Sequence, residues 1–333
     1  MFPEPSYPTP VRACPELGSA RAELWLKNDG LSHPVYGGNK VRKARALIDE
    51  ALRRNARRVL SFGAAGSHHL LTLALFARAA GLPSAAVVMP QPRSDHAQAT
   101  LRAAIGLGLR TYPASQAALV PLLLARAWRP GDYVIPPGGS NALGARACAD
   151  AIDELMQQVE RGLLPTPDCI VVPLGSGGTC GGLAAGVVRR GLPCRVIGVQ
   201  VVAGFAPSVA ARFLARETLR KTGHARLAPA LRTQLVFDAT QVGAGYGYES
   251  AAGCRASEIA TKIGLELDQT YTAKAFASVL ELLNGRSSLV PAPVGRPLRV
   301  LYWHTLAATA LEPLLVDAPQ AHEVPTGLAK LLR

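Results

Sequence analysis

The chain has 333 residues, of which 49% are hydrophobic and 18% charged, a composition typical of a globular protein with one large or two medium domains. Its formal net charge is +13, but the 29 arginines that supply most of it are dispersed, so we interpret them as solvated surface rather than as a nucleic-acid-binding patch. The longest apolar stretch, around 117–127, is interrupted by Pro121 and carries Arg126, so no membrane-spanning segment is expected.

Short β-branched or apolar runs alternate with longer stretches rich in alanine and leucine. In chain order the first half of the pattern predicts a helix over 41–54, a strand over 58–62, a helix over 67–80, a strand over 85–89, a helix over 94–105, a strand over 110–112, a helix over 115–127 and a strand over 133–135. The second half predicts a helix over 142–161, a strand over 169–173, a helix over 180–190, a strand over 196–201, a helix over 207–221 and a strand over 299–303. Such alternation favours an α/β fold of mostly parallel twisted sheets flanked by helices. The number of elements exceeds one modest sheet, so we predict a large domain over 1–49 and 148–333 and a small α/β domain over 50–147.

Cysteines and histidines give little sign of a metal or disulfide framework. The six cysteines lie far apart without a C-x-x-C pair, a pattern typical of reduced core thiols. His68 and His69 are adjacent on a predicted helix and therefore point in different directions, so no metal site is expected. His33, His96 and His224 stand in polar contexts and are expected to be solvated. The N-terminus lacks the basic-then-apolar pattern of a signal peptide, and a cytoplasmic location is expected.

The segment 175–182 is the strongest chemical signal. It carries five glycines between the strand over 169–173 and the following helix, and glycines let backbone N–H groups converge on an anion at a helix start. The segment is neither a Walker A loop nor a G-x-G-x-x-G fingerprint on a first strand. The alternative to a phosphate site is a tight turn between strand and helix that binds no ligand. We favour the phosphate site. Cys180 lies at the helix start, where a thiol can be acidified, but a packing role is the better interpretation.

Two of the seven lysines stand in the segment 37–43, at the start of a predicted helix. Taken alone, Lys40 reads as a surface lysine. Paired with a phosphate site more than a hundred residues downstream, it becomes a candidate Schiff-base lysine.

The segment G-G-N-K-V-R-K over 37–43 resembles the cofactor-lysine motif of the fold-type II pyridoxal-phosphate (PLP) enzymes, in particular the D-cysteine desulfhydrase and 1-aminocyclopropane-1-carboxylate (ACC) deaminase branch. Further segments resemble that branch in the same order: G-S-H-H over 66–69, I-P-P-G-G-S-N-A-L-G over 135–144, 175–182, V-G-A-G-Y-G over 242–247, L-D-Q-T-Y-T-A-K-A over 267–275 and V-L-Y-W-H-T over 300–305. The resemblance covers nearly the whole chain. It implies a two-lobed fold related to the tryptophan synthase β subunit, with the large domain binding PLP, and a homodimer.

The resemblance also implies roles for individual residues. Lys40 would hold PLP and move the Cα proton of the substrate, with Ser67, Tyr271 and Tyr302 as further catalytic residues. PLP would also be bound by Asn39, His68, Gly175, Ser176, Gly177, Gly178, Thr179 and Thr305, the last facing the pyridine nitrogen. The substrate would contact Ser67, His69, Gly139 and Tyr246.

Four positions depart from the family pattern. His68 stands where the family has an asparagine, Leu306 and Ala307 replace two glycines, and Ala273 replaces a glycine before Lys274. These changes are compatible with cofactor binding and point to a diverged substrate.

The resemblance implies a PLP-dependent lyase or deaminase, also classed among the hydrolases, that eliminates a β-substituent from a small amino acid and releases a 2-oxo acid and ammonia. Alternatives are ACC ring opening, β-replacement or a specialised biosynthetic step, and a catalytically silent binding protein that keeps the fold. Small amino acids are the expected partners, without nucleic acid or membrane.

Overall fold

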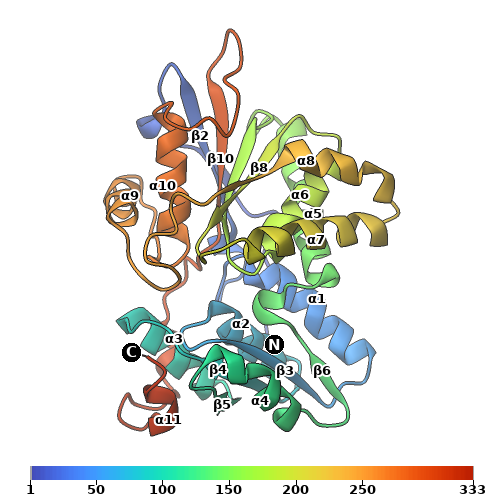
Figure 1. Cartoon of the computed structure of the whole chain (residues 1–333), viewed down its shortest axis with the longest axis vertical. Coiled ribbons are helices and arrows are strands. Elements are labelled where there is room, and N and C mark those ends of the chain that lie inside the picture. Colours follow the sequence, from blue (N-terminus) through green and yellow to red (C-terminus); the bar gives the residue numbers. More distant parts are fainter. Residues whose placement is uncertain (1, 333) are drawn as a thin grey trace.

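The structure is a computed structural model that describes residues 2–332, and it has two lobes, each built on its own sheet (Figure 1). The large lobe holds six strands in the order β1 (Val11–Ala13), β2 (Ala22–Asn28), β10 (Leu298–His304), β7 (Cys169–Leu174), β8 (Arg195–Gln200) and β9 (Leu235–Asp238). The small lobe holds four, in the order β5 (Leu109–Pro113), β4 (Ser84–Met89), β3 (Arg58–Ala64) and β6 (Asp132–Val134). All neighbouring strands are parallel except β1 and β2, which confirms the predicted α/β fold of mostly parallel sheets.

Helices cover both sheets. They are α1 (Lys40–Arg53), α2 (His68–Ala79), α3 (Asp95–Gly106), α4 (Val120–Ala127), α5 (Ala142–Glu160), α6 (Gly178–Arg189), α7 (Ala206–Lys221), α8 (Leu231–Gln234), α9 (Ala251–Thr261), α10 (Thr272–Leu283) and α11 (Thr326–Ala329). Short 3-10 turns stand at Pro15–Leu17, Asp29–Leu31, Ala117–Leu119, Pro137–Gly139, Ala225–Ala230 and Glu312–Leu315. No helix among residues 2–332 combines the length and apolar character that a membrane span requires.

Strand β10 shows how the large sheet is buried on both faces. Successive side chains of a strand point to opposite faces. Leu301 and Trp303 therefore join the core formed with α5 and α6, whereas Val300 and Tyr302 join the core formed with α9 and α10. Figure 1 shows these two helical layers on either side of the sheet. This double burial explains why the central strands read as continuous apolar runs.

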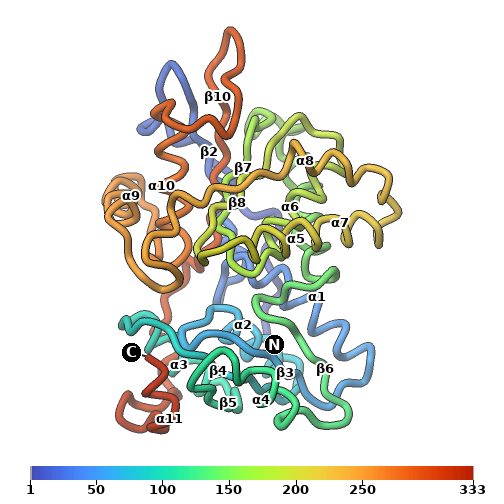
Figure 2. Tube along the Cα trace, viewed as in Figure 1, coloured from blue at the N-terminus to red at the C-terminus, as the bar shows by residue number. Residues whose placement is uncertain are grey.

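The chain crosses between the lobes more often than the sequence predicts. The last segment descends from β10 to the small lobe, as Figure 2 shows, and its Val324, Leu328 and Leu331 lie in the core of that lobe. The apolar side of α1 packs into the same core. The predicted division assigned the C-terminal segment and most of α1 to the large domain, because apolar periodicity identifies a buried face but not the sheet that covers it.

Five of the six cysteines are buried, as the interpretation as core thiols predicts, whereas Cys254 is half-buried. Burial raises the pKa of Cys180 to about 12, as a packing role requires. The prediction for His33 was wrong: it is buried against Phe2 and Phe76, and its Nε2 lies 3.0 Å from the Pro3 carbonyl oxygen.

Candidate active site

A cavity of about 780 Å³ lies between the two lobes. Both lobes contribute to its wall, from α1, the end of β3 and the start of α2 on one side to the β7–α6 loop and the segment before α10 on the other. Of the predicted site residues, thirteen line the cavity: Asn39, Lys40, Ser67, His68, His69, Gly175, Ser176, Gly177, Gly178, Thr179, Tyr246, Tyr271 and Thr305. Residues up to 266 positions apart in the sequence, Asn39 and Thr305, are therefore brought to one site, as expected for an α/β fold whose ligands bind beyond the carboxyl ends of the strands.

The loop between β7 and α6 has backbone geometry that only glycines allow. Gly177 has φ +89°, in the left-handed region, and a Cβ there would lie 2.8 Å from the backbone nitrogen of Ala211. A Cβ on Gly178 would lie 2.5 Å from Oγ of Ser140, which accepts a hydrogen bond from the Gly178 amide at 3.1 Å. The first amides of α6 lack partners within the helix and border the cavity, and the helix dipole adds positive potential there. The loop can therefore hold a phosphate.

Lys40 is the first residue of α1 and faces this loop across Asn39. The Asn39 side chain donates to Oγ1 of Thr179 at 2.8 Å and accepts from Nζ of Lys40 at 3.1 Å. Burial, and next the charge of Lys43, lower the pKa of Lys40 to about 7. Near neutral pH a large share of the amine is therefore uncharged and nucleophilic.

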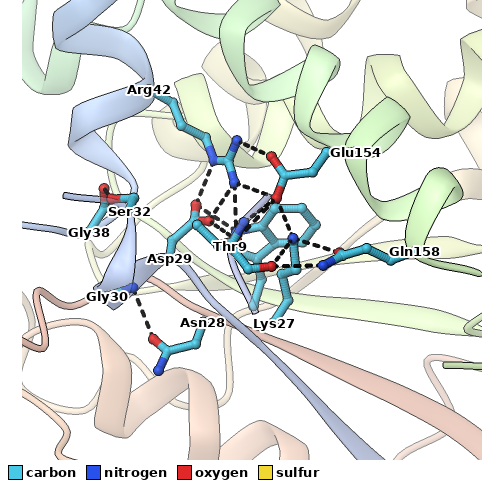
Figure 3. Close-up of polar contacts among 11 residues, drawn as sticks. Thr9, Lys27, Asn28, Asp29, Gly30, Ser32, Gly38, Arg42, Glu154 and Gln158 are labelled. Atoms are coloured by element: carbon cyan, nitrogen blue, oxygen red, sulfur yellow. Dashed lines mark hydrogen bonds and ion pairs between the residues drawn. The ribbon is translucent and has the colours of Figure 1, made fainter. Parts of the chain in front are cut away.

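A network of buried charges fixes the start of α1 (Figure 3). Arg42 donates to Asp29 and to Glu154, each at 2.8 Å at the closest, and Glu154 also pairs with Lys27. Asp29 also accepts from Nε1 of Trp303 at 2.8 Å. Burial alone raises the pKa of Asp29, but the charge and hydrogen bonds of Arg42 outweigh it and lower the pKa. The positive charges of Lys27 and Arg42 thus balance the negative charges of Asp29 and Glu154, and Arg42 stands two residues after Lys40.

The backbone completes this support. The Asp29 carbonyl accepts from the Gly38 amide at 2.8 Å, and the Ser32 hydroxyl donates to the Gly38 carbonyl at 3.0 Å. Gly38 has φ +96°, and a Cβ there would lie 2.8 Å from the Thr305 carbonyl. The turn before Lys40 therefore requires glycine and is held against the end of β10.

Ser67 is the N-cap residue of α2, yet its side chain makes no capping hydrogen bond and instead borders the cavity. His69 lies one residue into the helix, and its Nε2 is 3.0 Å from Oγ of Ser61. Burial, followed by the charges of Lys43 and Lys40, lowers the pKa of His69 to about 3. His69 is therefore a neutral hydrogen-bonding group at the cavity wall.

Both ring nitrogens of His68 are engaged by the protein. Nδ1 lies 2.5 Å from the Tyr36 hydroxyl and Nε2 lies 3.1 Å from Nε2 of His96. The sequence analysis predicted that His68 contacts the cofactor. Such a contact would have to replace the hydrogen bond with Tyr36 or the one with His96. His96 is exposed as predicted, but it is hydrogen bonded to a residue of the cavity wall, which the polar context of its sequence did not indicate.

Two tyrosines cover the large-lobe side. The Tyr271 hydroxyl donates to the Tyr246 hydroxyl at 2.9 Å, and burial raises the pKa of both, that of Tyr246 to about 12. Lys274 holds the loop that carries Tyr246 by donating to the carbonyls of Val242 and Gly245 at 2.8 and 2.6 Å. The two phenols can therefore supply protons but do not ionise at neutral pH.

Two predicted site residues do not reach the cavity. Tyr302 is fully buried between β10 and α10, where its hydroxyl donates to the Thr272 carbonyl at 3.1 Å. Its place in mid-strand explains this, because residues that meet a ligand follow the end of a strand, as Thr305 does. Gly139 lies behind the wall and packs against Leu47 and Lys43, while its neighbour Gly138 takes the place beside the cavity.

Sequence reasoning missed Asp268 and Tyr36 as wall residues. Among the described residues that line the cavity, Asp268 is the only carboxylate, and it caps α10 by accepting from the Tyr271 amide and the Thr272 hydroxyl, each at 2.7 Å. Its position in L-D-x-x-Y-T, three residues before Tyr271, was the signal available. Lysines outnumber carboxylates in the wall, which suits an anionic ligand.

Comparisons with known proteins agree with this geometry. Residues 4–292 match the family model described as "Pyridoxal-phosphate dependent enzyme". The chain is 33% identical to nocardicin C-9′ epimerase of Nocardia uniformis subsp. tsuyamanensis over 289 residues, covering 83% of this chain and 86% of the relative. It is 30% identical to D-cysteine desulfhydrase of Klebsiella pneumoniae subsp. pneumoniae, covering 91% and 93%. A crystal structure of an ACC deaminase homologue superposes with a TM-score of 0.72 at 24% identity, covering 95% of this chain and 96% of that one.

Proposed function

This chain belongs to the pyridoxal-phosphate-dependent enzyme family, and we propose that it is a lyase that eliminates the β-substituent of a small amino acid such as cysteine, releasing a 2-oxo acid and ammonia. The observation that carries the proposal is the pairing of Lys40, whose lowered pKa leaves a share of its amine uncharged near neutral pH, with a glycine loop that can hold a phosphate. The homodimer and the cytoplasmic location stay predictions.

The residues around the cavity fit the cofactor. We assign its covalent attachment to Lys40 and its phosphate to Ser176, Gly177, Gly178 and Thr179. The cradle at Gly178 leaves no room for a Cβ, so the backbone can approach a bound group closely. Thr305 offers the ring a neutral hydroxyl, which suits β-elimination better than transamination.

When bound, PLP acidifies the Cα–H of the amino acid joined to it. Nζ of Lys40 would accept that proton, because its lowered pKa leaves a share of the amine unprotonated near neutral pH. Tyr271 and Tyr246 retain their protons and can donate one to a departing β-group. Ser67 and His69 offer hydrogen bonds to the substrate carboxylate from the start of α2.

Epimerisation is the second candidate, because the relative at 33% identity is an epimerase. Both reactions begin by removing the Cα proton and differ in whether a proton returns to the opposite face or a β-substituent leaves. The test is a panel of D- and L-amino acids with and without a β-leaving group, assayed for 2-oxo acid, ammonia and optical inversion. Equal amounts of oxo acid and ammonia from cysteine support elimination, whereas inversion without oxo acid supports the second candidate.

Uptake of PLP by the apoenzyme is expected to depend on pH through Lys40. Because burial lowers the pKa of Lys40 to about 7, the rate of covalent attachment should rise as pH increases through about 7 and then level off. An ordinary lysine, with a pKa of about 10.4, would give a rate that still rises tenfold per unit at pH 9. The growth of the bound cofactor's visible absorbance measures the rate, and pyridoxal, which has no phosphate to titrate, is the control aldehyde.

Ser67→Ala is expected to lower turnover on cysteine by about 10²-fold while cofactor content stays within about twofold of wild type, because the hydroxyl faces substrate and caps nothing. Ser94→Ala is the matched control: Ser94 caps α3 by accepting from the Ala97 amide at 3.1 Å, so its loss costs about 1 kcal/mol of stability and spares turnover. A collapse of cofactor content in Ser67→Ala with unchanged turnover per bound cofactor would make Ser67 a cofactor ligand instead.

A further inference from the structure

Three side chains from three separate segments form a hydrogen-bonded row from the cavity wall to the surface. Tyr36 precedes α1, His68 begins α2, and His96 stands in the first turn of α3. The Tyr36 hydroxyl lies 2.5 Å from Nδ1 of His68, and Nε2 of His68 lies 3.1 Å from Nε2 of His96. Each ring nitrogen of the central histidine thus faces a different partner, and the three groups connect in series.

The two ends of this row differ in exposure. Tyr36 and His68 belong to the cavity wall, and only 1% of the Tyr36 surface is exposed. His96 is exposed and does not line the cavity. The row therefore runs from a buried phenol in the cavity wall to an imidazole that is exposed to solvent.

The central histidine is held in its neutral form. Burial, and next the neighbouring His96, lower the pKa of His68, an effect that Lys40 reinforces and Asp268 opposes. A neutral imidazole has one N–H and one bare nitrogen, so it can take up a proton at one nitrogen while giving one up at the other. Burial of the Tyr36 phenol likewise raises its pKa and keeps it protonated.

We propose that Tyr36, His68 and His96 form a proton relay between the cavity and solvent, with His96 as its solvent terminus. The proposal rests on the proposed function only for the use of the proton, which would serve the departing β-group or the product carbon.

The transfers balance without any oxidant or reductant. When the Tyr36 O–H bond breaks and its proton enters the cavity, Nδ1–H of His68 passes its proton to the Tyr36 oxygen. Nε2–H of His96 then passes its proton to Nε2 of His68, and a solvent acid protonates Nδ1 of His96. Each histidine ends as the other neutral tautomer, and the reverse sequence carries a proton out. His68 never has to become a cation.

The test replaces the outer member, His96→Gln, which keeps a hydrogen-bond donor to His68 but cannot exchange tautomers. With cysteine as substrate, kcat should fall about 10-fold or more with KM within about twofold, and added imidazole should restore kcat. The solvent deuterium isotope effect on kcat should rise, because proton delivery becomes slower. His322→Gln, an exposed histidine that does not line the cavity, is the control and should change none of these values.

A second measurement needs no substrate and so separates a failure of the relay from a failure of the proposed function. In protein labelled with ¹⁵N-histidine, the His68 ring should be neutral from pH 6 to 8, and its nitrogen shifts should move in both His96→Gln and Tyr36→Phe. Three results would each overturn the relay. They are a His68 imidazolium at pH 7, His68 nitrogen shifts that are unchanged in His96→Gln, and a reduced kcat of His96→Gln that added imidazole does not restore.

Discussion

Lys40→Ala is expected to abolish covalent cofactor attachment and to lower turnover by about 10³-fold or more, because one amine both anchors the cofactor and moves the Cα proton. The fold should survive. Nζ of Lys40 donates one hydrogen bond, to Asn39, and burial disfavours its charge, so removing it leaves no partner of opposite charge exposed in the interior. Visible absorbance, turnover and a urea midpoint measured on the same preparation separate the effects.

Lys262→Ala is the matched control, since Lys262 is exposed at the end of α9 and should affect none of the three measurements. An added alkylamine should restore part of the turnover of Lys40→Ala but not of a misfolded protein. A Lys40→Ala enzyme that retains a tenth or more of wild-type turnover would remove Lys40 from the chemistry.

Asp29→Asn is expected to cost about 3 kcal/mol or more of stability, although the two side chains have nearly the same shape. Every neighbour of the Asp29 carboxylate is a donor: the Thr9 hydroxyl, Nε and Nη2 of Arg42, and Nε1 of Trp303. An amide nitrogen there faces another donor, and a buried Arg42 loses one of its two counter-charges, a loss of the kind that costs about 3–5 kcal/mol. Urea unfolding of the apoenzyme measures the change.

Asp49→Asn, on α1 itself, provides the comparison. Asp49 pairs with Arg45 at 2.9 Å, but both side chains are about half exposed, so the variant should change stability by less than about 1 kcal/mol. Because the Asp29 carboxylate also holds Arg42, two residues after Lys40, Asp29→Asn should bind PLP more weakly than Asp49→Asn. Equal urea midpoints for the two variants would mean that the buried network does not hold α1.

The sequence predicted the elements whose pattern is local and missed those that depend on distant partners. Strand β7 is apolar throughout and lies in the centre of the sheet, so its run of side chains was sufficient. Strand β2 was not predicted, since it contains Glu23 and Lys27. Lys27 is tolerated in a fully buried position because Glu154, 127 residues away, pairs with it, and no local pattern reports such a partner.

The same distinction holds for the site. Lys40 taken alone was interpreted as a surface lysine, and the 175–182 loop could have been a turn without ligand. Their meeting could be predicted because the two features occur together and resemble the motifs of one family in the same order. The link between His68 and His96 depends on how α2 and α3 pack, and each histidine read alone was uninformative. Tyr302 lies away from the cavity for a related reason, since a motif gives the order of residues but not which of them stand beyond the end of a strand.

Reduction of the purified holoenzyme with borohydride, followed by peptide mapping, tests the central claim most directly. The cofactor should be found on the peptide that contains Lys40, in an amount close to one per chain, and it should be absent from the same peptide of Lys40→Ala. A cofactor fixed on Lys43, Lys274 or any other lysine would contradict the account.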